Sequence, residues 1–343
     1  MTSARTPLLG REHIVAAAWA ALHPHAGVLL TGPEGIGRSA VLEHLAVRAA
    51  AAGARVLRCA PTPADSAAPY AALVDLLRPL PGNLLPRALG QALDDPRQAE
   101  PFAVHRALAA VLADLSRDAP LLLAVDDLQH LDEASAASLA HLAHRAASLR
   151  LTLAATARTG PQQGFGRDEL LPPRALQIEL PPLAEEFVRA LLPEPSRRLL
   201  ALAAGRPGHA RALARHPAEA PDELPATLRK RQLAPVRPLP PTTRQALLLT
   251  AHAAAPTLEL LRAAGVDDPV AALAPALGAG LASVAADGRV QLAAPVLAAA
   301  LRDDADHART LAAHEALAQA HPADTLSHAR HLALARPWGD ESL

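Results

Sequence analysis

Short apolar runs alternate with segments of helical periodicity through residues 1 to about 180. A continuous apolar run is typical of a strand buried on both faces of a parallel sheet, whereas apolar residues three and four apart indicate one face of a helix. We therefore expect an α/β domain over 1–180, with a parallel sheet flanked by helices. The expected strands are 26–31, 55–59, 121–125, 151–156 and 175–180, and the expected helices are 39–52, 70–77, 102–115 and 134–145.

The pattern becomes helical after Pro181 and Pro182. Residues 183–222 are expected to form an all-helical subdomain that ends in a proline-rich linker, and 223–343 a further domain. Three helical patterns in that domain precede a hairpin in which Asp287-Gly288 is expected to form a two-residue turn. Three helices followed by a hairpin predict a winged helix, and the rest of the domain is expected to be helical. The three helices are expected at 243–253, 257–264 and 270–279, and the strands of the hairpin at 281–284 and 289–292.

Composition limits the kinds of protein that this chain can be. The 343 residues are 50% hydrophobic but only 2% aromatic, so the core must be built from Ala, Leu and Val. A net charge of −1 argues against nucleic-acid binding as the main activity. The single cysteine, Cys59, allows neither a disulfide framework nor a thiolate metal site. Without an apolar signal-peptide region or a run of membrane-spanning length, we expect a cytoplasmic protein with no membrane contact.

Residues 32–39 fit the phosphate-binding pattern G-x-x-x-x-G-K-[ST] at every position except Arg38. An expected strand precedes the stretch and an expected helix follows it, which is the arrangement of a P-loop. Its glycines allow backbone N–H groups to converge on one anion at the N-terminus of the helix. A glycine-rich turn without a ligand is the alternative interpretation. The expected phosphate-binding residues are Gly32, Pro33, Glu34, Gly35, Ile36, Gly37, Arg38 and Ser39, and the Ser39 hydroxyl is expected to bind Mg²⁺.

Arg38 makes nucleotide turnover doubtful. The lysine of the pattern reaches the β- and γ-phosphates as a compact charge, whereas arginine is longer, planar and forked, so the exchange is not conservative. A second explanation comes from composition. Of the 33 basic residues only Lys230 is lysine, as in a GC-rich genome, so Arg38 also fits simple drift from lysine.

Two acidic residues, Asp126 and Asp127, close the apolar run 121–125. A carboxylate at the carboxyl end of a buried strand beside a P-loop is where a P-loop ATPase holds Mg²⁺. We expect Asp126 to bind the metal and Asp127 to polarise the attacking water; two solvated acids in a loop are the alternative. Arg158, which follows the next strand, is placed to reach a γ-phosphate, or else is a surface arginine.

The sixteen histidines offer little further chemistry. His141 and His144 are spaced three apart on an expected helix, as are His328 and His331. Such pairs can bind a metal, but neither has a clear third ligand nearby. We therefore interpret them as histidines on helix surfaces.

Taken together, the motifs resemble those of the signal-transduction ATPases with numerous domains (STAND), within the AAA+-like P-loop group. They are most similar to the ATPase core of the large LuxR-type regulators of actinobacteria, over nearly the whole chain. Residues 155–158 resemble the sensor strand of that family. Gly205-Arg206-Pro207 resembles its Gly-x-Pro turn, whose proline packs on the base. Besides the P-loop, the resemblance is carried by Leu8-Leu9-Gly10-Arg11-Glu12, by 102–106 and above all by 120–135.

The resemblance implies a nucleotide-binding domain, a helical lid over 183–222 and a winged helix, which close over ADP and open on exchange for ATP. It adds Gly10 and Arg11, near the adenine, and Pro207 to the nucleotide-binding residues. ATP or ADP with Mg²⁺ are the implied ligands. The winged helix of such proteins packs and senses, so we expect a protein partner or self-association and no direct DNA binding by this chain.

The sequence departs from the family at several positions. Besides Arg38, Ala294 stands where the family has a nucleotide-contacting histidine, and His130 replaces an aromatic residue. Helical repeats and a C-terminal helix-turn-helix do not follow. Three hypotheses result: a regulatory ATP- or ADP-binding switch with weak or absent hydrolysis, a nucleotide-independent pseudo-ATPase scaffold for a protein partner, and an active Mg²⁺-dependent ATPase in which Arg38 substitutes for lysine.

Overall fold

The structure is a computed structural model that describes residues 8–22, 27–95, 99–146, 150–159, 170–172, 174–215, 223–323 and 325–336. The chain divides into two compact units, Met1–Pro182 and Leu183–Leu343, and each is described by itself. The glycine-rich segment 160–166 and most of the proline-rich segment 217–225 lie outside the described residues. Within the described ranges, no helix has the length and apolar character needed to cross a bilayer.

The first unit contains a five-stranded parallel sheet with the strand order β2-β3-β4-β1-β5. The central strands are almost entirely buried, as the continuous apolar runs predict for a sheet covered on both faces. β4 lies between β1 and β3, so the carboxyl ends of these three strands meet at one edge of the sheet. The strands are β1 Gly27–Gly32, β2 Arg55–Cys59, β3 Leu121–Val125, β4 Leu151–Arg158 and β5 Leu176–Glu179.

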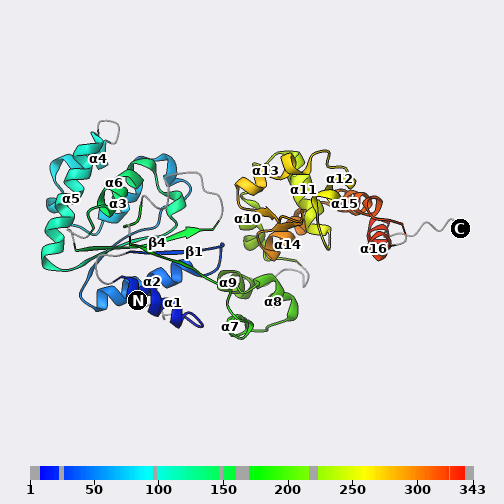
Figure 1. Ribbon diagram of the computed structural model, residues 1–343, viewed down its shortest axis with the longest axis horizontal. Helices are drawn as coiled ribbons and strands as arrows, with labels where there is room; N and C mark the ends of the chain where they lie inside the picture. Colours follow the sequence, from blue (N-terminus) through cyan, green and yellow to red (C-terminus); the bar gives the residue numbers. More distant parts are fainter. Residues whose placement is uncertain are drawn as a thin grey trace. The chain divides into compact units, whose positions relative to one another are not determined.

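Helices cover both faces of this sheet (Figure 1). Alternate residues of each strand point to opposite faces, which separates two apolar clusters. Leu30 and Leu122 join the cluster under α1 and α2, whereas Leu29 and Leu123 join the cluster under α3, α5 and α6. The helices of this unit are α1 Glu12–Ala21, α2 Arg38–Ala51, α3 Ala71–Leu77, α4 Arg87–Asp94, α5 Pro101–Asp118 and α6 Glu133–Ala143.

The sequence-based expectations for this unit are largely confirmed. All five strands are present, with ends that differ from the expected ones by at most two residues. The four expected helices are present too, although the last ends at Ala143 rather than at residue 145. Helices α1 and α4 were not expected. α1 is apolar after its first two residues and so lacks an amphipathic period, and Gly90 lowers the helix propensity of α4.

The second unit is built almost entirely of helices around one apolar cluster. Three helices, α11 to α13, precede a two-stranded antiparallel sheet, β6 and β7, in the order expected from the sequence. The helices are α7 Glu185–Arg189, α8 Arg197–Ala203, α9 Pro207–Arg215, α10 Ala226–Leu233, α11 Pro241–His252, α12 Leu258–Ala263, α13 Pro269–Gly278, α14 Pro295–Asp304, α15 His307–Ala320 and α16 Leu326–Ala335. The strands are β6 Ala282–Val284 and β7 Val290–Leu292.

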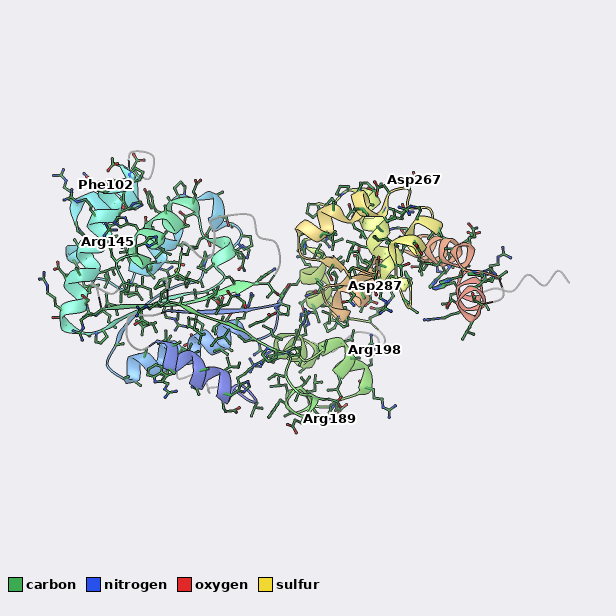
Figure 2. The ribbon with its side chains drawn as sticks, viewed as in Figure 1. Phe102, Arg145, Arg189, Arg198, Asp267 and Asp287 are labelled. Atoms are coloured by element: carbon green, nitrogen blue, oxygen red, sulfur yellow. The ribbon has the colours of Figure 1, made fainter. Side chains whose placement is uncertain are left out.

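The turn of the hairpin differs from the expected two-residue turn. Ala285 N–H donates to the Arg289 carbonyl and Gly288 N–H donates to the Ala285 carbonyl, both over 2.9 Å, so the loop has three residues, 286–288. Gly288 adopts the left-handed conformation (φ 77°) that such loops place at their last residue. The Asp287 carboxylate, marked in Figure 2, accepts the Arg289 N–H and holds the turn.

Three histidines from separate helices meet inside the second unit. His252 of α11 packs against His314 of α15, with ring centroids 4.5 Å apart, and the Nδ1 atoms of His314 and His331 lie 2.9 Å apart. His331 is only 2% exposed, so interpreting it as a surface histidine was wrong. Burial and, secondly, His314 lower the pKa of both His252 and His331 to about 4. Among the residues described, no group of three or more potential ligands could hold a metal ion.

These histidines predict that acid destabilises the second unit. The folded pKa values lie below the unfolded value, so the unfolded chain binds more protons and stability falls as the pH drops from about 6.5 towards 4. Between pH 7 and pH 5 we expect the free energy of unfolding to fall by about 2 kcal/mol. This is half of what the two pKa shifts would give if both histidines were fully buried, and it is reduced because His252 is partly exposed. Urea unfolding followed by circular dichroism at both pH values measures this loss.

A matched pair of variants tests the assignment. His252→Leu with His331→Leu should reduce the pH dependence of unfolding, whereas His307→Leu, at an exposed position of α15, should leave it unchanged. An equal pH dependence in the double variant and the natural chain would show that other groups cause it.

Candidate functional site

The loop 32–39 connects the carboxyl end of β1 to the first turn of α2. Gly32, Gly35 and Gly37 all have positive φ angles, of 148°, 78° and 104°. A Cβ on Gly32 would lie 2.9 Å from Cγ2 of Ile36, so this position also has no room for a side chain. The loop thus has the backbone that a phosphate nest requires, and it leads into the unpaired N–H groups of a helix N-terminus.

Buried contacts hold the loop in this conformation. Ile36 is fully buried in the apolar cluster beneath α1 and α2. The Arg11 guanidinium donates to the Ile36 carbonyl over 3.1 Å and is 3% exposed. Burial lowers the pKa of Arg11. Arg11, which the resemblance places near the adenine, therefore holds the loop through its bond to Ile36. Gly10, the residue before it, has a positive φ of 68°.

The Arg38 side chain bonds to the protein itself at both ends of its fork. Nη1 donates to the Gly32 carbonyl over 3.0 Å, and Nη2 forms an ion pair with Asp127 Oδ1 over 3.1 Å. The side chain is 6% exposed. Burial lowers the pKa of Arg38, and Asp127 opposes that shift. The guanidinium thus ties the start of the P-loop to the loop after β3.

Asp126 and Asp127 are linked by a residue that the sequence did not single out. Thr156 of β4 donates its hydroxyl to Asp126 Oδ1 over 2.5 Å and accepts the Asp127 N–H over 2.8 Å. Thr156 is fully buried. Asp127 has a φ of 49°, a left-handed conformation that is uncommon for a residue other than glycine and that occurs often at functional sites. A single hydroxyl thus joins the Asp126 carboxylate to the backbone of Asp127.

Arg158 and Glu34 complete the network. Arg158 is the register partner of Gly32 in the sheet, which brings the end of β4 beside the P-loop. Its guanidinium lies 3.9 Å from a Glu34 oxygen, and its backbone N–H donates to Gln129 Oε1 over 3.2 Å. Gln129 Nε2 in turn donates to Asp127 Oδ1 over 2.7 Å. The predicted residues Glu34, Arg38, Asp127 and Arg158 are therefore brought together.

The two residues predicted to hold Mg²⁺ line one hollow, with a volume of about 590 Å³. Ser39 contributes an exposed hydroxyl from the first turn of α2, and Asp126 contributes a carboxylate from the end of β3. Oxygen donors of this kind suit Mg²⁺, which binds through few protein ligands and keeps several waters. Across the hollow, Arg58 and Arg78 are paired with Glu43 and Asp75.

Asp132 connects the loop after β3 to helices α3 and α6. The carboxylate is 2% exposed and accepts backbone N–H groups from Tyr70, Ala72 and Ser135 over 2.7, 3.2 and 2.8 Å. It therefore caps α6 and fixes the start of α3 at the same time. The sequence showed Asp132 only as part of the segment 120–135, because its partners at the start of α3 lie 60 residues away.

Pro207 belongs to the second unit and is described within that unit alone. It begins α9 after a turn in which Ala204 and Gly205 are left-handed, with φ angles of 47° and 71°. Arg206 of this turn donates to the Ala293 carbonyl. The Gly-x-Pro turn is therefore in contact with Ala293. The next position, Ala294, is the one at which the family has its nucleotide-contacting histidine.

Residues 7–154 match the family model described as AAA ATPase domain, which covers under half of the chain. Together with the parallel sheet, the match supports a P-loop AAA+ core in the first unit. No curated protein matches the chain.

Solved structures with a similar fold include the Orc1 protein of Aeropyrum pernix in complex with DNA, at 19% identity, covering 89% of this chain and 95% of that chain, with a TM-score of 0.44. A STAND protein of Pyrococcus horikoshii with a tetratricopeptide repeat sensor is 14% identical over 99% of this chain and 49% of that chain, with a TM-score of 0.40. AMPPCP-bound DnaA of Aquifex aeolicus is 15% identical over 58% and 57% of the two chains, with a TM-score of 0.36. Such low TM-scores carry no functional argument.

The Thr156 bridge predicts a loss of stability in Thr156→Val. This variant keeps the shape of the side chain but leaves the Asp127 N–H and an Asp126 oxygen without their partner, which should cost about 1–3 kcal/mol. Thr152→Val, on the same strand and not part of this network, is the control. Urea unfolding of both variants measures the difference, and equal losses would show that the bridge does not stabilise the unit.

Proposed function

We propose that this chain is a regulatory protein that binds ATP or ADP with Mg²⁺ and hydrolyses ATP weakly or not at all. One observation carries this proposal: the Arg38 guanidinium is buried and bonded to the Gly32 carbonyl and to Asp127. The residue that replaces the P-loop lysine thus has its donors engaged by the protein, while the backbone of the loop keeps the conformation of a phosphate nest.

Binding of the nucleotide would depend on groups that Arg38 does not occupy. The nest and the first turn of α2 would hold the phosphates. Ser39 and Asp126 would hold Mg²⁺, whose charge, when it is bound, would neutralise the β- and γ-phosphate oxygens. Glu34 belongs to the loop and Arg158 lies beside it, and Arg158 would face a γ-phosphate only if it left its contact with Glu34.

Hydrolysis would be weak for two separate reasons. Arg38 would bring its charge to the phosphates only by giving up both bonds that hold its buried guanidinium, those to Asp127 and to the Gly32 carbonyl. Asp127, which we assigned to the attacking water, already accepts bonds from Arg38 and Gln129 on the same oxygen. Loss of a charged donor to the transferred phosphoryl group typically removes several kcal/mol of transition-state stabilisation.

For the second unit we propose the arrangement that the resemblance implies. Helices α7 to α9 would form the lid, and α11 to α13 with β6 and β7 the winged helix. Nucleotide exchange would shift the population between closed and open forms, as in the LuxR-type regulators, and the open form would bind a protein partner or a second copy. Direct DNA binding by this chain is not part of the proposal.

The second candidate function is a pseudo-ATPase scaffold that needs no nucleotide. The Arg38–Asp127 ion pair favours it, since the pair joins the P-loop to the end of β3 without any ligand. A scaffold would keep this pair and the sheet while losing affinity for the nucleotide, so the two functions differ in one measurable property.

Calorimetric titration of the full chain with ADP and with ATP, each with Mg²⁺, tests the proposal. We expect dissociation constants on the order of micromolar and ATP turnover near the background rate. Arg38→Lys should raise turnover by about tenfold or more, because a single ammonium group reaches the phosphates and leaves Asp127 free for water. Arg48→Lys on the same helix is the control.

The other outcomes are equally informative. No binding by folded, nucleotide-free protein would establish the scaffold and contradict the switch. Turnover in the natural chain as high as in Arg38→Lys would show that Arg38 works as a catalytic substitute and that the chain is an active ATPase.

Asp126→Asn tests the metal assignment. The amide oxygen keeps the bond from Thr156 but removes the charge, so affinity for ATP in the presence of Mg²⁺ should fall by about tenfold, toward the value measured in EDTA. Asp118→Asn, at an exposed position of α5, should change nothing. If Asp126→Asn kept both the full affinity and its dependence on Mg²⁺, the metal would be bound elsewhere.

A further inference from the structure

A groove lies between α11 and α15 of the second unit, which pack against each other (Figure 1). Its volume is about 450 Å³. Leu248 and Leu249 of α11 and Ala312 and Ala316 of α15 form its apolar lining. The small side chains on α15 keep the space between the two helices open, and the volume is in the range of pockets that hold one small molecule.

A smaller hollow of about 50 Å³ adjoins the groove. Arg244, Leu248 and Arg309 line both spaces, so the two form one continuous site. The smaller hollow adds Arg237, and Asp304 is the one carboxylate among the residues that line either space. Three guanidinium groups therefore surround one end of an apolar groove.

Within the part of the chain that the structure describes, these three guanidinium groups have no bonded partner. Elsewhere in the second unit, exposed arginines such as Arg189 and Arg289 form ion pairs with nearby carboxylates. Among the described residues, no hydrogen bond or ion pair involves the guanidinium group of Arg237, Arg244 or Arg309; the bond of Arg309 to Asp306 is made by its backbone N–H. The positive charge at this end of the groove is thus available for a ligand.

We propose that this groove binds an organic anion with an apolar body, such as a carboxylate or sulfonate attached to an aromatic ring or a branched chain. The acid group would bond to Arg244 and Arg309, whose planar forks match a carboxylate in two parallel hydrogen bonds. The apolar body would lie on Leu248, Leu249 and the alanines of α15, where it is removed from water. This site is independent of the P-loop and of any nucleotide.

Two fluorescent probes of the same shape separate charge from apolar contact. The anion 8-anilinonaphthalene-1-sulfonate carries a sulfonate, and N-phenyl-1-naphthylamine has the same rings without it. Titrated into the full chain, the anion is expected to bind at one saturable site. In the double variant Arg244→Gln, Arg309→Gln its affinity should fall by about tenfold or more, while the affinity of the neutral probe should stay the same.

Two further variants complete the test. Arg262→Gln, at an exposed position of α12 outside the groove, should leave the affinity for both probes unchanged. Ala312→Phe should block the groove and remove the binding of both probes, and circular dichroism establishes that each variant is folded. The proposal is wrong if the anion does not bind at a single site, or if its affinity survives the loss of both arginines or the filling of the groove.

Discussion

The ion pair between the buried Arg38 and the partly exposed Asp127 is the interaction on which the rest of the site depends. It joins the P-loop, which follows β1, to the loop that follows β3. The Arg38 guanidinium is buried, so removing Asp127 would leave its charge without a partner, and the pair is constrained by stability before any ligand is considered. Under the proposed function the same pair would also limit the chemistry, because it engages the residue that stands for the P-loop lysine and the carboxylate that would activate water.

The parallel sheet places these residues within reach of each other. β4 lies between β1 and β3, and its register sets Thr156 beside Leu30 and Arg158 beside Gly32. Thr156 therefore reaches both aspartates from the neighbouring strand, and Arg158 reaches Glu34 of the P-loop. A shift of one residue in this register would turn the Thr156 hydroxyl to the opposite face of the sheet and break the bridge.

The sequence predicted the strands well because buried parallel strands are continuous apolar runs, and it located the P-loop because glycine spacing is a local property. It did not predict Thr156, whose role depends on the register between strands, nor that Arg38 turns away to Asp127, which lies 89 residues along the chain. His331 was placed wrongly on a surface, since a polar residue at helical spacing does not reveal that His314 packs against it. A local sequence pattern does not show which distant segments of the chain come into contact.

Phosphate binding and phosphate transfer depend on different parts of a P-loop, and under the proposed function this chain would separate them. Binding uses backbone dipoles, which the glycines preserve whatever residue stands at position 38. Transfer needs a positively charged side chain that can reach the phosphoryl group. Here two acceptors hold the Arg38 guanidinium, each about 3 Å from a different one of its nitrogens. A lysine has a single nitrogen and could not fill both positions as Arg38 does. Arginine therefore has a structural role at this position that codon bias alone does not explain.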